Sequence, residues 1–138
     1  MRTPIYVFFA LVFLFSCGQD KKEEEALFKE VMDIHDIAMP EMGTLRKISK
    51  QLTIRIDSLT ADSLAIDSTQ VAEILTTVGE LKKANESMME WMRQFKQLEE
   101  GTPHGEVMNY LKEQKKSIEK VRDDMNNAKK QGEYYLEE

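Results

Sequence analysis

Apolar residues recur at alternating steps of three and four along most of the chain after Glu25. This spacing places them on one face of a helix, and a seam sustained for three or more heptads is typical of helices packed side by side. The chain contains three such seams: Phe28, Val31, His35, Ala38, Met42, Leu45, Ser49, Leu52, Ile56 and Leu59; then Val71, Ile74, Val78, Leu81, Asn85, Met88, Met92 and Phe95; then Val107, Leu111, Gln114, Ile118, Val121, Met125 and Ala128.

Residues that favour helix ends separate the seams. Asp67 or Ser68 is the expected N-cap of the second helix, because their side chains accept hydrogen bonds from nearby backbone amides. Gly101 is expected to end the second helix, Thr102 to cap the third, and Pro103 to occupy its first position. The predicted helices cover residues 25–59, 68–99 and 103–135.

Short connections force neighbouring helices to run antiparallel. The sequence therefore predicts an all-α fold, an up-down-up three-helix antiparallel bundle with coiled-coil-like packing. Pro40 interrupts the first seam, and a proline inside a helix removes an amide and clashes with the preceding turn. We expect a kink at Pro40, near residues 36–39, or a break into two helices.

The N-terminus carries a separate signal. Arg2 is followed by an apolar run over residues 5–15, which is too short for the roughly 20 residues that span a bilayer as a helix. A short apolar core behind a basic start is typical of a secretory signal. The run ends in Leu14-Phe15-Ser16-Cys17, which resembles a bacterial lipobox.

The lipobox reading makes residues 1–16 a removed signal peptide and Cys17 an acylated first residue of the mature chain. Stable anchoring takes about two acyl chains, so a triacylated cysteine is held firmly. The alternative is an ordinary buried cysteine in a helix. Cys17 is the only cysteine, which excludes a disulfide within one chain.

Residues 17–25 are predicted to be the lipidated cysteine with an acidic flexible tether, and residues 26–138 the helical bundle domain. The stretch GQDKKEEE that follows Cys17 resembles the export signal of surface lipoproteins in the Bacteroidota. The alternatives are a solvated spacer and the first turn of a helix.

Charge narrows the range of partners. The whole chain has a formal net charge of −6, and removal of residues 1–16 takes away Arg2 and no acidic residue, which leaves −7. An acidic chain is unsuited to nucleic acid, whose phosphates require a basic surface. We therefore expect membrane attachment through Cys17 and no nucleic-acid binding.

Folding the seams against each other places two pairs in one layer, His35 with Met39 and Met88 with Met92. Thioethers with an imidazole suit copper(I), so this layer can be read as a metal site. The alternative is that methionines fill irregular core space beside the kink. We expect no enzyme activity and no cofactor, because no nucleophile has a plausible base and no glycine-rich phosphate loop is present.

Three stretches carry a family resemblance: HDIAMPEMGTLRKISKQL, MMEWM and YLKEQKKSIEKVRDDMNNA. They resemble a group of small lipoproteins in Flavobacteria-like Bacteroidota, often labelled "viral A-type inclusion protein". The motif of His35-Asp36, Met39-Pro40 and Met42-Gly43 is the most recognisable part. The resemblance covers nearly all of the predicted mature chain and implies no activity, no catalytic residues and no binding residues.

The sequence thus favours a non-enzymatic lipoprotein of the outer membrane, in which a helical bundle binds or spaces an envelope partner. Exposure on the cell surface and a periplasmic position are both left open. One alternative is a periplasmic sensor or copper-handling protein that uses the layer of His35 and the methionines. Another is a structural helix former that self-associates through its seams.

Overall fold

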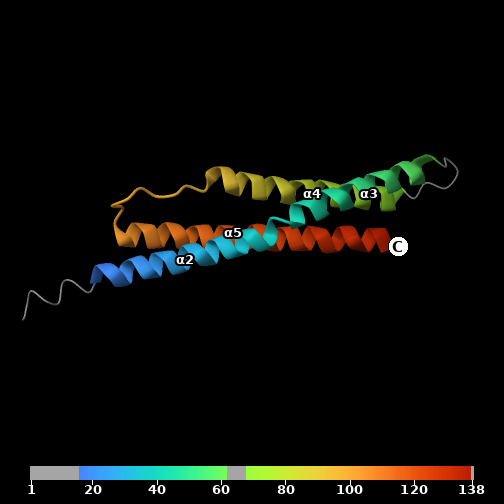
Figure 1. Cartoon of the computed structure of the whole chain (residues 1–138). Helices are drawn as coiled ribbons and strands as arrows, with labels where there is room; N and C mark the ends of the chain where they lie inside the picture. The colour runs from blue at the N-terminus through green and yellow to red at the C-terminus, as the bar shows by residue number, and fades with distance from the viewer. Residues whose placement is uncertain (1–15, 62–67, 138) are drawn as a thin grey trace, which may run out of the picture.

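The computed structural model describes residues 16–61 and 68–137, and these form four helices that pack lengthwise against each other in one rod (Figure 1). The helices are α2 (Ser16–Ala38), α3 (Glu41–Ala61), α4 (Ser68–Gln94) and α5 (His104–Glu137). α2 and α3 run in the same direction, α4 returns, and α5 runs forward again. The predicted all-α bundle of three helices is confirmed, with α2 and α3 together forming the first.

The break in the first helix lies at Met39 and Pro40. The backbone N–H of Met39 still donates to the carbonyl of His35 at 2.8 Å, which completes α2. Proline has no N–H to continue the ladder. α3 instead starts with hydrogen bonds that span three residues, as in a 3₁₀ turn. The N–H of Met42 donates to the carbonyl of Met39 and the N–H of Gly43 to that of Pro40, both at 3.2 Å. The predicted break is therefore present.

α5 is the helix that holds the others together, because it packs against α2, α3 and α4. The break lets α2 and α3 pack against different helices. α2 packs mainly on α5, whereas α3 packs on both α4 and α5. In the described residues, no Cα atom of α2 approaches within 8 Å of one in α4. Large side chains must therefore fill the space between these two helices.

The predicted seams form the core. Its largest fully buried side chains come from all three helices of the bundle: Val31, Leu45, Leu52, Ile74, Leu81, Met88, Ile118 and Met125. Heptad spacing therefore predicted the buried faces correctly. It missed Trp91 and Ala84 on α4, and Gly132 near the end of α5, all of which are also buried.

Two predicted boundaries are wrong. The expected flexible tether over residues 17–25 is helical, since α2 begins at Ser16. The second helix ends at Gln94, not at residue 99, and residues 95–99 run as an extended connection. Asp67, one of the two expected caps of α4, lies outside the described residues.

Gly101 does not end the second helix but lies in the turn before α5, where its φ of 91° is a conformation that favours glycine. The hydroxyl of Thr102 donates to the carbonyl of Glu99 at 2.8 Å, so it closes this turn and does not cap α5. Pro103 precedes the first helical residue by one position, and its carbonyl accepts from the N–H groups of Glu106 and Val107.

Candidate functional site

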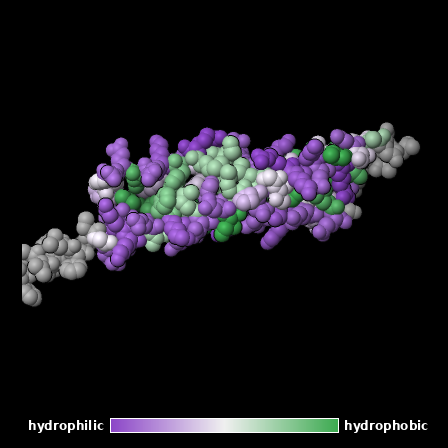
Figure 2. Space-filling view, in the orientation of Figure 1, coloured by the Kyte–Doolittle hydropathy of each residue, from purple (hydrophilic) through white to green (hydrophobic). Residues whose placement is uncertain are grey.

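A groove of about 910 Å³ opens at the end of the rod where α2 begins. We call it the end groove. The first turns of α2, the connection between α4 and α5, and the start of α5 form its walls. Its apolar lining consists of Phe28, Phe95, Leu98, Val107, Tyr110 and Leu111. In Figure 2, hydrophobic residues show between hydrophilic ones at this end of the rod.

The groove exists because α4 stops early. Phe95 turns its ring onto Trp91, with centroids 4.9 Å apart, and onto Tyr110, with centroids 6.0 Å apart. The hydroxyl of Tyr110 then accepts a 2.7 Å hydrogen bond from the backbone N–H of Lys96. This long-range bond occupies an amide that a continuing helix would use internally, so the chain leaves α4 in an extended conformation.

Five rings from α2, α4, α5 and the connection form a continuous aromatic cluster behind the groove. Phe28 contacts Phe95 with centroids 6.2 Å apart, and His35 contacts Trp91 with centroids 5.6 Å apart. The contact of His35 with Trp91 bridges α2 and α4, whose backbones stay apart, and the contact of Phe28 with Phe95 joins α2 to the connection after α4. Phe28 is 40% exposed, so the cluster is open to the groove at this ring.

Trp91 lies at the centre of this cluster. It is 6% exposed, so it belongs to the bundle interior and is not an exposed anchor for a partner. Its indole Nε1 has no hydrogen-bond partner among the described residues. Packing against His35 and Phe95, and not a hydrogen bond, therefore fixes the ring.

His35 contacts a neighbouring carboxylate and an aromatic ring. Nδ1 of His35 lies 2.9 Å from Oδ1 of Asp36, and the ring lies against Trp91. Met39 is 40% exposed at the break, while Met88 is fully buried. The grouping of His35, Met39, Met88 and Met92 around copper stays a hypothesis. Among the described residues, no group of three or more His, Cys, Asp or Glu side chains is placed to hold a metal ion.

Acidic residues dominate the charged lining of the groove. The lining includes five carboxylates, two lysines and one histidine: Asp20, Glu24, Glu25, Glu99 and Glu100; Lys21 and Lys96; His104. The sequence stretch DKKEEE was expected to be a tether, yet its helical conformation places four of these side chains in one wall.

His104 joins the two helices that flank the groove. Its Nδ1 lies 2.8 Å from Oε1 of Glu24, and since a carboxylate only accepts, Nδ1 carries the hydrogen. The hydrogen bond to Glu24 raises the pKa of His104 above its ordinary value of 6.5, and the charges of Asp20 and Glu23 add to this effect. A protonated His104 therefore holds the first turns of α2 against α5.

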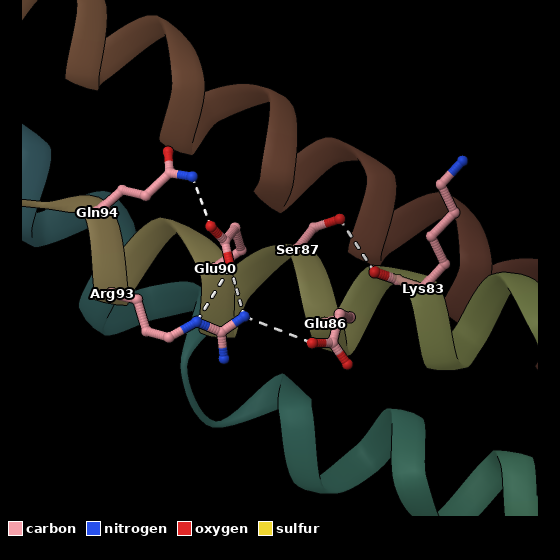
Figure 3. Close-up of polar contacts among 6 residues, drawn as sticks. All are labelled: Lys83, Glu86, Ser87, Glu90, Arg93 and Gln94. Atoms are coloured by element: carbon pink, nitrogen blue, oxygen red, sulfur yellow. Dashed lines mark hydrogen bonds and ion pairs between the residues drawn. The ribbon is translucent and has the colours of Figure 1, made fainter.

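The guanidinium nearest the end of α4 is not available to the groove. Arg93 donates to Glu90 through both Nε and Nη2, and its Nη2 also lies 3.4 Å from Glu86 (Figure 3). Gln94 donates to the same Glu90 carboxylate. The hydrogen bond from Arg93 is the main reason that the pKa of Glu90 is lowered. Arg93 does not line the groove, which leaves its rim acidic.

Cys17 lies in the first turn of α2, at the same end of the rod as the end groove. In the described residues, no helix is long and apolar enough to cross a membrane.

Comparison of the chain with protein-family models, with curated proteins and with solved structures finds no match.

Proposed function

We propose that this protein is a lipoprotein of the outer membrane, anchored through acyl chains on Cys17, whose helical bundle binds an envelope partner and catalyses no reaction. The observation that carries this proposal is the junction at residues 14–17, where an apolar run of signal-peptide length ends in Leu-Phe-Ser-Cys. A charged helix follows at once, so the cysteine stands between an apolar leader and a water-soluble bundle.

The position of the end groove supports a binding role. The groove and the start of α2 share one end of the rod, so an anchor on Cys17 would hold the groove close to the membrane surface. Its lining combines aromatic side chains with charged ones, a composition suited to recognition. The acidic net charge disfavours attachment to anionic lipid headgroups without the acyl chains.

Metabolic labelling with palmitate tests the anchor. The wild-type chain is expected to incorporate label, and Cys17→Ser to incorporate none. Ser16→Ala is the matched control, because it keeps a small residue before the cysteine and should be labelled like the wild type. Labelling of Cys17→Ser at the wild-type level, or an unlabelled wild-type chain, would contradict the proposal.

A further inference from the structure

The wall of the end groove includes three successive backbone N–H groups without a hydrogen-bond partner among the described residues. Residues 95–99 are extended, and the backbone N–H groups of Gln97, Leu98 and Glu99 donate to no group in the described part of the chain. Gln97, Leu98 and Glu99 also line the groove. An extended segment with free backbone donors resembles the edge of a sheet, and such edges accept another strand.

The side chains around this segment fit a particular kind of strand. The aromatic floor offers Phe28, Phe95 and Tyr110 to apolar side chains. The rim offers Glu25 and Glu99, for which the structure gives no lysine or arginine partner among the described residues, to basic ones. Because side chains of a strand alternate between two faces, one extended peptide can present apolar groups inward and basic groups to the rim.

We propose that the end groove binds an extended basic peptide segment of an envelope protein, which pairs as a strand with residues 97–99. This inference rests on the proposed binding function and names its partner class. Three features of the groove select this partner: the unpaired backbone, the aromatic floor and the excess of carboxylates. An anionic lipid or an acidic peptide would meet the same carboxylates and be repelled.

The test uses the native chain isolated in a non-ionic detergent and a dye-labelled synthetic peptide, acetyl-Lys-Val-Lys-Tyr-Lys-Val-Lys-amide, with fluorescence anisotropy as the readout. We expect saturable binding that weakens as salt rises, because rim charges are screened. The charge-reversed peptide, with glutamate in place of each lysine, is expected not to bind. Equal binding of both peptides would overturn the proposal.

Two modified peptides test the strand pairing. Each carries N-methyl groups on the residues of one edge only, which removes the backbone donors from that edge and leaves the side chains unchanged. One of the two is expected to bind about tenfold more weakly, since main-chain hydrogen bonds supply affinity in strand addition. If both bind like the parent peptide, the pairing with residues 97–99 is wrong.

Protein variants test the rim and the floor. The double variant Glu25→Gln/Glu99→Gln is expected to weaken binding about tenfold, and Glu113→Gln/Glu133→Gln, which removes the same charge from exposed positions outside the groove, less than about twofold. Phe28→Ala should also weaken binding about tenfold. Ile37→Ala, at another exposed apolar position of α2, should leave the affinity unchanged.

Equal effects of the groove and control variants would overturn the proposal, provided that far-UV circular dichroism shows intact helices. The outcome is independent of the lipid anchor. A chain that incorporates palmitate but binds neither peptide refutes the groove's partner and leaves the anchor standing. A chain that binds the basic peptide without incorporating palmitate refutes the lipid anchor and leaves the groove's partner standing.

Discussion

At the scale of single residues, Gly132 lies where α5 closely approaches its neighbours. A Cβ atom placed there would lie 2.5 Å from Cγ2 of Ile48 on α3 and 3.2 Å from Cδ1 of Leu81 on α4. Ile48 is β-branched, so its methyl group has little freedom to move away. The absence of a side chain at residue 132 therefore lets three helices meet at one point.

Gly132→Ala is expected to destabilise the protein by about 1–3 kcal/mol, because overpacking outweighs the better helix propensity of alanine. The matched control is Gly79→Ala on α4, where no atom lies within 4 Å of the added Cβ. That variant should be more stable by about 0.5–1 kcal/mol. Urea unfolding measures both changes, and a stabilised Gly132→Ala would refute the close approach.

His104 makes a pH-dependent contact between α2 and α5. Its pKa is raised in the folded state by the hydrogen bond to Glu24. The stabilising contribution is therefore fully present below the unfolded-state pKa of 6.5, and it is lost as the pH rises through the higher folded-state pKa. We expect the first turns of α2 to exchange their amide hydrogens faster above that pH, after correction for the intrinsic rate.

NMR titration of the His104 ring checks this account directly. The wild-type protein is expected to titrate above the ordinary value for histidine, and Glu24→Gln to titrate closer to it. Glu113→Gln provides a control, since that carboxylate is not among the groups that shift the pKa of His104. An unchanged titration in Glu24→Gln would show that Glu24 is not the principal partner.

At the scale of elements, the break between α2 and α3 sets the neighbours of each half of the first helix. Pro40 lies directly before α3, a position that suits its fixed φ and its missing N–H. We expect Pro40→Ala to keep the break, because α2 packs mainly on α5 and α3 on both α4 and α5.

Pro40→Ala should lower the free energy of unfolding by about 0.4–1 kcal/mol, since proline restricts the unfolded chain. Far-UV circular dichroism should report unchanged helix content, and urea unfolding should give the loss of stability. A gain of both helicity and stability would mean that α2 and α3 fuse into one straight helix, which would contradict the role given to the break.

Hydrophobic spacing was sufficient to predict the three buried faces, and the presence of Pro40 inside the first seam was sufficient to predict the break. Both predictions depend on residues near in sequence. Hydrophobic spacing could not predict where α4 ends. The residues after Gln94 have no local helix breaker before Gly101, and the helix stops because Phe95 and the Lys96 amide bind Tyr110 on another helix. The end groove was therefore not predicted, since it depends on this long-range contact.

The burial of Trp91 does not follow from its position just off the seam. Its ring fills the space between α2 and α4. The hydrophobic pattern of one helix carries no information about the separation of two helices. For the same reason, the contact of the His35 ring with Trp91 was not predicted. The acidic stretch after Cys17 was read as a tether because it lacks apolar residues, but contacts such as Glu24 with His104 give it partners.

At the scale of the whole molecule, α5 is tied to the broken first helix at several points along the rod. Lys115 donates to Glu30 of α2 at 2.6 Å, Lys129 to Glu41 of α3 at 2.8 Å, and Arg55 of α3 to the carbonyl of Tyr135 at 2.7 Å. The hydrogen bonds to Glu30 and Glu41 raise the pKa values of Lys115 and Lys129. Partly exposed pairs such as these fix the register of the helices more than they add stability.

The proposed anchor gives this rod a direction, because the first turn of α2 and the end groove lie at one end and the last turn of α5 at the other. A bundle attached at Cys17 would present its groove near the membrane and extend α5 away from it. A lipid on this one residue would therefore determine where in the cell a partner of the groove can be met.

Mass spectrometry of the N-terminal peptide from the native protein tests the account most directly. We expect a peptide that begins at Cys17, with diacylglycerol on the thiol and a third acyl chain on the amine. Detection of an unmodified Cys17 thiol, or of residues 1–16 still attached, would contradict the lipid anchor and the envelope role that depends on it.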